Sequence, residues 1–224
     1  MKITKDYQGL TRAENGDYVW DGDLISEEDI EIELGNCLVV HGNVQARALK
    51  CATSLLADRS IRAGEGITVG FAITAGGDIR AGGYISAIWS IRADRSIRAG
   101  TFIVGWEIRA GMGITAGGDI RAGRDICAGM GITAGGDIRA GRDICAGRDI
   151  RAGGDIRAGR DICAGRDIRA GTFIDCENRI FAGTNIFHNS KGCNKNIICT
   201  ELRHGEICSG ALKITKTENG NEEE

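Results

Sequence analysis

The sequence predicts an all-β protein whose chain winds into a triangular parallel β-helix, or β-solenoid, with three six-residue units in each 18-residue coil. Three observations predict this fold: a six-residue repeat, an 18-residue duplication superimposed on it, and the absence of proline from 224 residues that include 35 glycines. Together they indicate very short strands separated by regularly spaced corners.

The six-residue repeat, or hexad, has the form Asp-Ile-Arg-Ala-Gly plus one variable residue. Isoleucine recurs every six residues from Ile61 to Ile103 and, after one five-residue step, from Ile108 to Ile186. A helix would spread these isoleucines around its surface, because six residues is not close to a multiple of about 3.6. In a strand, Ile and Ala point to one side and Asp and Arg to the other. The hexad therefore predicts a short strand with an apolar inner face.

The second period indicates how many strands make one coil. Met112–Gly129 and Met130–Gly147 are identical, and Arg148–Gly165 matches them at 15 of 18 positions. Duplication in units of three hexads predicts three strands and three corners per coil. Stacked coils form parallel sheets spaced by roughly 4.8 Å. Glycine at the corners permits the backbone to turn, including at positive φ.

Composition agrees with this fold and excludes others. Proline would remove a hydrogen bond from a ladder in which every coil pairs with its neighbours. Collagen needs abundant proline and glycine at every third position. A disordered chain would lack aliphatic residues, whereas 42% of this sequence is hydrophobic. Aromatic residues make up only 5%, as expected for a narrow interior filled by Ile and Ala.

The repeat also suggests how the chain is divided. Terminal coils of a repeat protein must be shielded from solvent, so we expect caps at both ends. The expected segments are an acidic N-terminal cap (1–31), degenerate early coils (32–60), a regular β-solenoid (61–186), a C-terminal closing cap (187–218) and a disordered acidic tail (219–224).

Charge and cysteine content limit the function classes. A net charge of −3 argues against a general nucleic-acid binder and against binding to an anionic membrane. The sequence contains no recognisable signal peptide and no apolar run long enough to span a membrane. Without a secretory signal, the nine cysteines are predicted to be reduced thiols. We therefore expect a protein of the bacterial cytoplasm.

Stacking of 18-residue coils places the outward side chains in rows. A dense row of arginines can bind phosphates, but in the repeat Arg follows Asp by two residues on the same face. We expect this alternation to offset like charges and keep the surface soluble, so nucleic acid is a distant alternative. The expected rows are Arg121, Arg139 and Arg157; Thr115, Thr133, Arg151 and Arg169; Arg109, Cys127, Cys145 and Cys163; Asp119, Asp137 and Asp155; and Asp125, Asp143 and Asp161.

No catalytic, cofactor or metal site is predicted. The three histidines lack a neighbouring carboxylate motif that would mark a general base, and no loop interrupts the regular coils. A zinc site near the C-terminus is disfavoured because the cysteines there form no Cys-x-x-Cys pair. The thiol row is interpreted as passive surface residues copied by duplication. The residues weighed for catalysis or zinc are His41, His188, His204, Cys193, Cys199 and Cys208.

The hexads resemble two families of β-solenoid. Hexapeptide-repeat acyltransferases place a small residue two positions before the large aliphatic one, whereas this chain has the reverse order, as in Ile120-Arg121-Ala122. The stretches Gly118–Ala122, Gly136–Ala140 and Gly154–Ala158 are similar to the Gly-Asp-Ile-Arg-Ala-like repeats of the bactofilins. That resemblance implies a right-handed triangular solenoid that forms polymers. The chain also resembles short Ile-x-Ala-Gly repeat proteins of bacteria and their phages, some of which inhibit host defence systems.

These observations favour a non-enzymatic, rigid protein-interaction module, encoded by a phage or prophage, that binds and blocks a host protein such as a defence nuclease, in the manner of an anti-CRISPR. A bactofilin-type polymer is the alternative, and phosphate binding by arginine rows is a distant one. A lateral homodimer is compatible with the module. Its candidate surface includes the aromatic residue at the five-residue step, the arginine rows and an acidic group that resembles nucleic acid in charge: Trp106, Arg121, Arg139, Arg157, Arg151, Arg169, Glu27, Glu28, Asp29 and Glu31.

Overall fold

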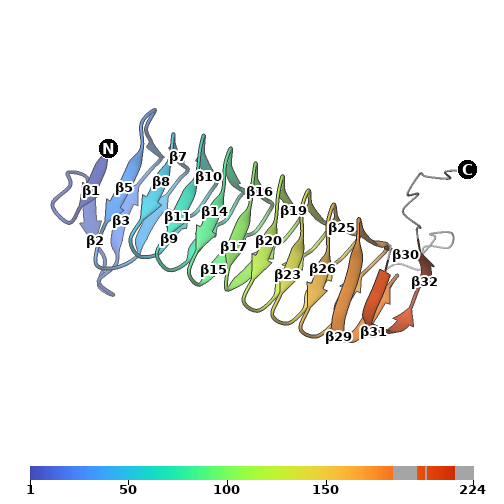
Figure 1. Ribbon diagram of the computed structural model, residues 1–224. Helices are drawn as coiled ribbons and strands as arrows, with labels where there is room; N and C mark the ends of the chain where they lie inside the picture. The colour runs from blue at the N-terminus through green and yellow to red at the C-terminus, as the bar shows by residue number, and fades with distance from the viewer. Residues whose placement is uncertain (184–195, 200, 215–224) are drawn as a thin grey trace, which may run out of the picture.

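The computed structural model describes residues 1–183, 196–199 and 201–214. They form a rod of stacked triangular coils, with the N-terminus at one end and the last strands at the other (Figure 1). The described residues contain strands, turns and bends but no helix, and therefore no helix able to cross a membrane. The predicted all-β parallel solenoid is confirmed.

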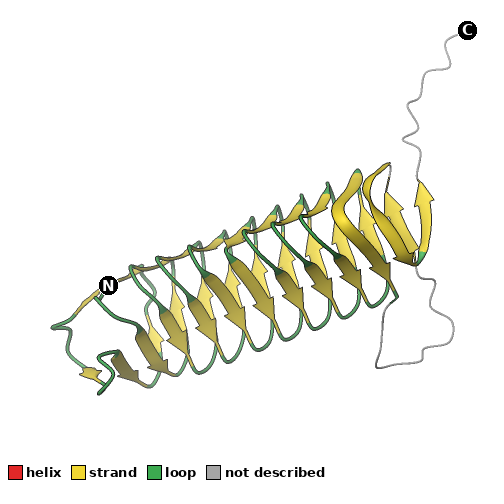
Figure 2. Cartoon of the chain, turned by 90° about the horizontal axis from the view of Figure 1, so that it is seen from below, coloured by secondary structure: helices red, strands yellow, loops and turns green. Residues whose placement is uncertain are grey.

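Each coil contributes one strand to each of three faces, which Figure 2 shows from below. The first face contains β1 (Lys2–Thr4), β5 (Ile30–Glu33), β8 (Leu49–Cys51), β11 (Ile67–Val69), β14 (Ile85–Ala87), β17 (Ile103–Gly105), β20 (Ile120–Ala122), β23 (Ile138–Ala140) and β26 (Ile156–Ala158). The second face contains β2 (Leu10–Arg12), β3 (Tyr18–Asp21), β6 (Leu38–His41), β9 (Leu55–Ala57), β12 (Ile73–Ala75), β15 (Ser90–Ala93), β18 (Glu107–Ala110), β21 (Ile126–Ala128), β24 (Ile144–Ala146) and β27 (Ile162–Ala164).

The third face is a separate sheet of 11 strands. It contains β4 (Leu24–Ile25), β7 (Val44–Ala46), β10 (Ile61–Ala63), β13 (Ile79–Ala81), β16 (Ile97–Ala99), β19 (Ile114–Ala116), β22 (Ile132–Ala134), β25 (Ile150–Ala152), β28 (Ile168–Ala170), β30 (Asn196–Cys199) and β32 (Ala211–Ile214). The long strands β29 (Phe173–Ala182) and β31 (Glu201–Ser209) continue the other two faces: β29 pairs with both β26 and β27, and so joins these faces at the C-terminal end.

The core is the inward row predicted from the hexads. Every isoleucine of the repeat from Ile61 to Ile180 is fully buried, and nearly all alanines two residues later are buried beside them; Ile186 lies outside the described residues. Parallel pairing is in register at an 18-residue offset, as between Ile79 and Ile97. Burial of one such side chain stabilises the fold by roughly 1.5–3 kcal/mol, so the repeat produces a continuous stabilising column.

The corner glycines have a different role from the one expected. Positive φ occurs among the described glycines only at Gly9, Gly16, Gly22, Gly183, Gly205 and Gly210. Elsewhere in the repeat the expectation of positive φ is wrong, and the reason for glycine is the closeness of the next coil. A Cβ on Gly135 would lie 2.0 Å from the carbonyl oxygen of Gly117, and one on Gly153 would lie 2.1 Å from that of Gly135.

The five-residue step between Ile103 and Ile108 is a tightened corner. The amides of Trp106 and Glu107 both donate to the carbonyl oxygen of Trp89, over 2.7 and 3.0 Å. Ser90 therefore pairs with Glu107 at an offset of 17 residues, and the 18-residue spacing resumes afterwards. The missing residue is absorbed at the surface without disturbing the core.

The two ends differ from the regular coils. At the N-terminal end, β2 pairs antiparallel with β3, and Tyr7 and Trp20 pack partly buried against the core. At the C-terminal end, β31 pairs with β29 through three register shifts. The boundaries expected for the two caps stay predictions; much of 187–218 and all of the tail 219–224 lie outside the described residues.

The close approach of coils makes a matched pair of glycine substitutions informative. Gly135→Ala should lower the free energy of unfolding by about 1–3 kcal/mol, because the added methyl overlaps backbone that cannot move alone. Gly131→Ala should change it little, since its Cβ would meet only the Asp149 carbonyl oxygen at 3.5 Å. Thermal denaturation followed by circular dichroism measures both; equal stability of the two variants would contradict the packing argument.

Candidate functional site

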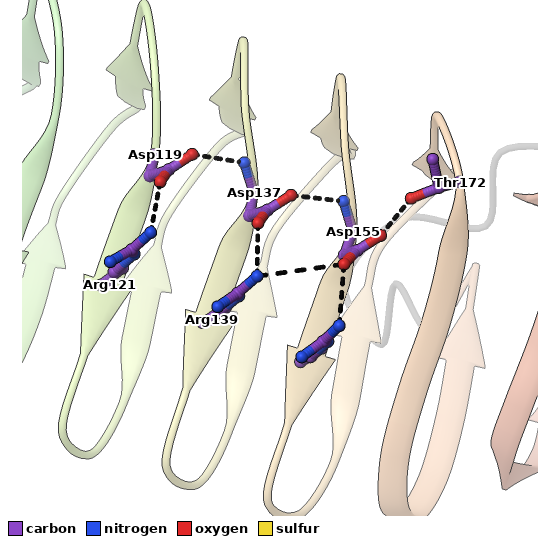
Figure 3. Close-up of polar contacts among 7 residues, drawn as sticks. Asp119, Arg121, Asp137, Arg139, Asp155 and Thr172 are labelled. Carbon is purple, nitrogen blue, oxygen red and sulfur yellow. Dashed lines mark hydrogen bonds and ion pairs between the residues drawn. The ribbon is translucent and has the colours of Figure 1, made fainter.

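Aspartate rows fasten successive coils to one another (Figure 3). The Oδ1 atom of Asp119 accepts the backbone N–H of Asp137 at 2.9 Å, and Asp137 accepts that of Asp155 at 2.8 Å. The row ends where the Thr172 hydroxyl donates to Asp155. Asp119 and Asp137 therefore each satisfy a backbone donor of the coil 18 residues ahead, and Asp155 accepts a side-chain hydroxyl of the next coil.

The second oxygen of the same carboxylates holds the arginine two residues later. Asp119 accepts from Arg121 at 2.7 Å, and Asp137 accepts from Arg139 at 2.6 Å (Figure 3). The backbone N–H of Asp137, helped by Arg121, lowers the pKa of Asp119 below its usual value. The hexad order Asp-x-Arg is thus a structural unit of the corner.

The same arrangement recurs on the third face and explains the predicted arginine rows. On the third face, Arg151 and Arg169 pair with the aspartates two residues before them at 3.1 and 2.9 Å. On the first face, Arg157 pairs with Asp155 at 3.0 Å in the same way. Thr115 and Thr133 replace arginine at positions where Gly113 and Gly131 replace aspartate. In this row the two residues are replaced together, which indicates a structural pairing at these positions. The five arginines predicted as a binding surface lie on the outside as expected, in two rows, with their charges already paired.

The predicted acidic group lies at the N-terminal end around β5. Asp29 forms two hydrogen bonds with Arg47, at 2.8 and 2.9 Å, and Glu31 pairs with Lys50 at 2.8 Å. These partners lower the pKa of both carboxyl groups. Glu27 and Glu28 line a shallow groove of about 370 Å³ with Met1 and Arg47. The next coil therefore neutralises Asp29 and Glu31, and the carboxylate of Glu28 lies 3.9 Å from the N-terminal amine.

The three cysteines of the thiol row lie on the second face, on β21, β24 and β27. Cys127 pairs in register with Cys145, and Cys145 pairs with Cys163. They are half-buried along the floor of an open groove of about 740 Å³, whose other lining is mainly alanine and glycine, with Arg92 and Arg109 at one end. Thiol contacts with Cys145 lower the pKa of Cys127 and Cys163, and the same contacts raise the pKa of Cys145.

The other residues weighed for catalysis or zinc binding do not form a common site among the described residues. His41 on β6 is exposed and contacts Asp58 at 2.9 Å. Cys199 is buried, whereas Cys208 is exposed. His204 belongs to β31, and His188 and Cys193 lie outside the described residues. In the part of the chain that the structure describes, no three His, Cys, Asp or Glu side chains are grouped as ligands of one metal ion.

The sequence analysis missed an exposed aromatic cluster. Trp106 was identified as unusual, but its partners were not. Trp106 stacks on Trp89 with ring centroids 6.1 Å apart, and Trp89 stacks on Phe71 at 5.8 Å. The signal was present, because these three residues occupy the same corner of successive coils at spacings of 18 and 17 residues.

Comparison with known proteins gives no family: no family model, no curated protein and no solved structure matches this chain.

The aspartate rows predict unequal roles for the two members of a pair. Asp137→Ala should lower the free energy of unfolding by about 1–3 kcal/mol, because it leaves the Asp155 N–H without its acceptor. Arg139→Ala removes only a partly exposed ion pair, which contributes about 0–1 kcal/mol. Urea denaturation of the two variants measures the difference. A larger effect of the arginine would show that the arginine row itself supports the fold.

Proposed function

We propose that this chain is a non-enzymatic, rigid protein-interaction module and that an exposed aromatic band is its binding surface. The band is a set of large apolar side chains on and beside the first face, spread over three successive coils. They are seven of the eleven exposed large hydrophobic residues in the described part of the chain: Phe71, Tyr84, Ile88, Trp89, Phe102, Val104 and Trp106. Clusters of exposed apolar side chains mark interaction sites in soluble proteins, and this clustering is the observation that carries the proposal.

The band borders the first face on both sides. Phe71, Trp89 and Trp106 stack at the corner with the second face, and their backbone amides continue the hydrogen-bonded ladder between coils. Tyr84 and Phe102 stack at the corner with the third face, with ring centroids 5.2 Å apart. Ile88, which precedes Trp89 at the corner with the second face, is 73% exposed. Aromatic stacking accounts for the order of the rings, but it does not account for the exposed aliphatic residue.

Glycines of neighbouring coils hold the rings in place. A Cβ on Gly123 would lie 2.2 Å from the Trp106 indole, and a Cβ on Gly66 would lie 2.7 Å from the Tyr84 ring. Both rings therefore lie closely over glycine backbone. Because side chains fixed before binding lose little conformational entropy, such a surface suits tight association.

The chemistry of the surroundings favours a protein partner with an apolar contact surface. Further along the first face, Arg121 and Arg139 are paired with aspartates, so the flank of the band carries little unpaired charge. A nucleic acid would need unpaired cations along the face. The aromatic residues resemble those that dominate binding energy in protein interfaces. We therefore commit to a different protein as the partner and treat a second copy of this chain as an outcome of the test.

The antiparallel strand β2 supports a discrete module over a bactofilin-type polymer. Rods that stack end to end must present matching parallel edges, and an antiparallel strand at the end of the second face interrupts that match. A bacterial cytoplasmic location, a phage origin and inhibition of a host nuclease stay predictions. The acidic residues around β5 are the surface that nuclease inhibition by charge mimicry would use.

The proposal predicts that the band contacts a partner in the source cell. A photocrosslinking amino acid in place of Trp89 should form a covalent adduct with one distinct protein. The same amino acid in place of Ile25, which is exposed outside the band, should form none. With the partner purified, Trp89→Ala with Trp106→Ala should weaken binding at least about tenfold, since aromatic anchors of interfaces contribute about 2 kcal/mol or more.

Two controls separate binding from stability. Trp89→Phe should retain most of the affinity, because phenylalanine already occupies this corner at Phe71, and Ile25→Ala should bind like the unmodified protein. Unchanged affinity of the double variant would reject the band as the binding surface. Sedimentation at micromolar concentration tests the other occupants: a dimer that the double variant abolishes would make a second copy the partner, and filaments would favour the polymer.

A further inference from the structure

The two ends of the rod cover the hydrophobic core unequally. At the N-terminal end, the inward side chains of Ile3 and Leu24 are 0% and 1% exposed, and Tyr7 and Trp20 pack against the core. The described residues of this end therefore cover their own core. The strands β31 and β32 lie at the opposite end of the rod (Figure 1).

The last strand of the third face leaves core positions open. Leu212 and Ile214 on β32 are in register with Ile197 and Cys199 on β30. Ile197 and Cys199 are fully buried, whereas Leu212 and Ile214 are 39% and 52% exposed. In the described part of the chain, β32 therefore exposes the kind of side chain that the strand before it buries.

The last strand of the other two faces shows the same loss of cover. Leu202 and Ile207 on β31 are in register with Ile174 and Ile180 on β29, which are fully buried, but are themselves only partly buried. Residues 215–224, which follow β32 in the chain, contain no hydrophobic side chain that could cover this end. The cover must therefore come from apolar residues elsewhere.

Both last strands also have an unpaired edge. Among the described residues, β31 pairs only with β29, and β32 pairs only with β30. These edges have nine and four residues, whereas β1, β2 and β4 at the N-terminal end have only two or three. Short edge strands resist pairing with another chain, and long ones are templates for it. The C-terminal end is therefore the one suited to an added strand.

A second copy of this chain matches that edge in both apolar side chains and charge. A two-fold axis perpendicular to the rod turns the second copy round, so that each edge strand runs antiparallel to its own copy. With the axis between His204 and Gly205, at the corner of β31, Leu202 lies opposite Ile207 of the second copy. In the same register, Arg203 lies opposite Glu206. Apolar residues thus meet apolar residues, and a positive charge meets a negative one.

The two charged residues are accessible for this contact. Glu206 is exposed and forms no ion pair with the described residues. Arg203 lies over the Phe173 ring at 3.7 Å and pairs with Glu201 at 3.0 Å, and both members of that pair are exposed. Because exposed ion pairs hold a side chain only weakly, Arg203 can exchange Glu201 for Glu206 of a second copy.

We propose that two copies of this chain join tail to tail through β31 and β32, and that each copy covers the open end of the other's core. The N-terminal caps point outward in this arrangement, so the assembly closes at two copies and does not grow into a filament. The inference is independent of the aromatic band, which lies on earlier coils and stays exposed on both rods.

Sedimentation and small-angle X-ray scattering test the arrangement. A tail-to-tail dimer has twice the mass of one chain and roughly double its maximum dimension, whereas a lateral dimer is little longer than one rod. Leu212→Lys should give a monomer, because it places a charge on the inner side of the edge strand. Ile25→Lys, on β4 at the opposite edge of the same sheet, is the matched control and should leave the dimer intact.

Exchanging the charges tests the register itself. Arg203→Glu and Glu206→Arg should each weaken the dimer at least about tenfold, because each places like charges opposite one another. An equimolar mixture of the two variants should form a heterodimer, since the two negative side chains of one chain then face the two positive side chains of the other. Circular dichroism of each variant alone establishes that it folds.

Three results would overturn the proposal. A chain that stays monomeric throughout the micromolar range would indicate that this end is covered within one chain. A dimer no longer than one rod, or one that Trp89→Ala with Trp106→Ala abolishes, would assign the contact to the side of the rod. Two charge variants that fail to combine when mixed would reject the register. A tail-to-tail dimer that persists in the tryptophan double variant supports the proposal whatever the outcome for the band.

Discussion

The hydrogen-bonded ladder between successive coils is the constraint on which the rest of this molecule depends. Each strand donates to and accepts from strands one coil away, at an offset of 18 residues along most of the rod. Proline is incompatible with such a ladder, and a Cβ at many corners would overlap the carbonyl oxygen of the coil before. The absence of one residue type and the abundance of another thus have the same backbone origin.

Because the coils stack in register, a residue type that recurs at one position of the 18-residue coil forms a row of identical side chains along the surface. The carboxylates of the aspartate rows are not free to bind a ligand, because their oxygens accept hydrogen bonds from backbone N–H groups and from arginines. The arginines are thereby occupied as well. The stacked aromatic residues of the band make no such side-chain hydrogen bonds to the backbone of the next coil. The proposed binding surface lies where the repeat departs from Asp-Ile-Arg-Ala-Gly.

The sequence predicted the fold closely because its periods are those of the structure. Ile and Ala face inward, and the rows of Arg121, Cys127 and Thr115 are those expected. Two features needed the structure. The sequence led us to expect positive φ at the corner glycines. Their actual role, which is to avoid a clash with the coil 18 residues before, depends on the spacing of the coils and needed the structure. The spacing of Phe71 and Trp89 is visible in the sequence, but the stacking of their rings and the exposure of their side chains depend on the geometry of the corner, which the period does not specify.

The central claim is that an interchangeable 18-residue coil sets the fold while the outward rows carry function. Deleting Met112–Gly129 tests it directly, because the next block is identical and every contact across the junction is re-formed. We predict a cooperatively folded rod with an unchanged type of circular dichroism spectrum, shorter by about 4.8 Å in its maximum dimension by small-angle X-ray scattering. An unfolded or aggregated product would contradict the account.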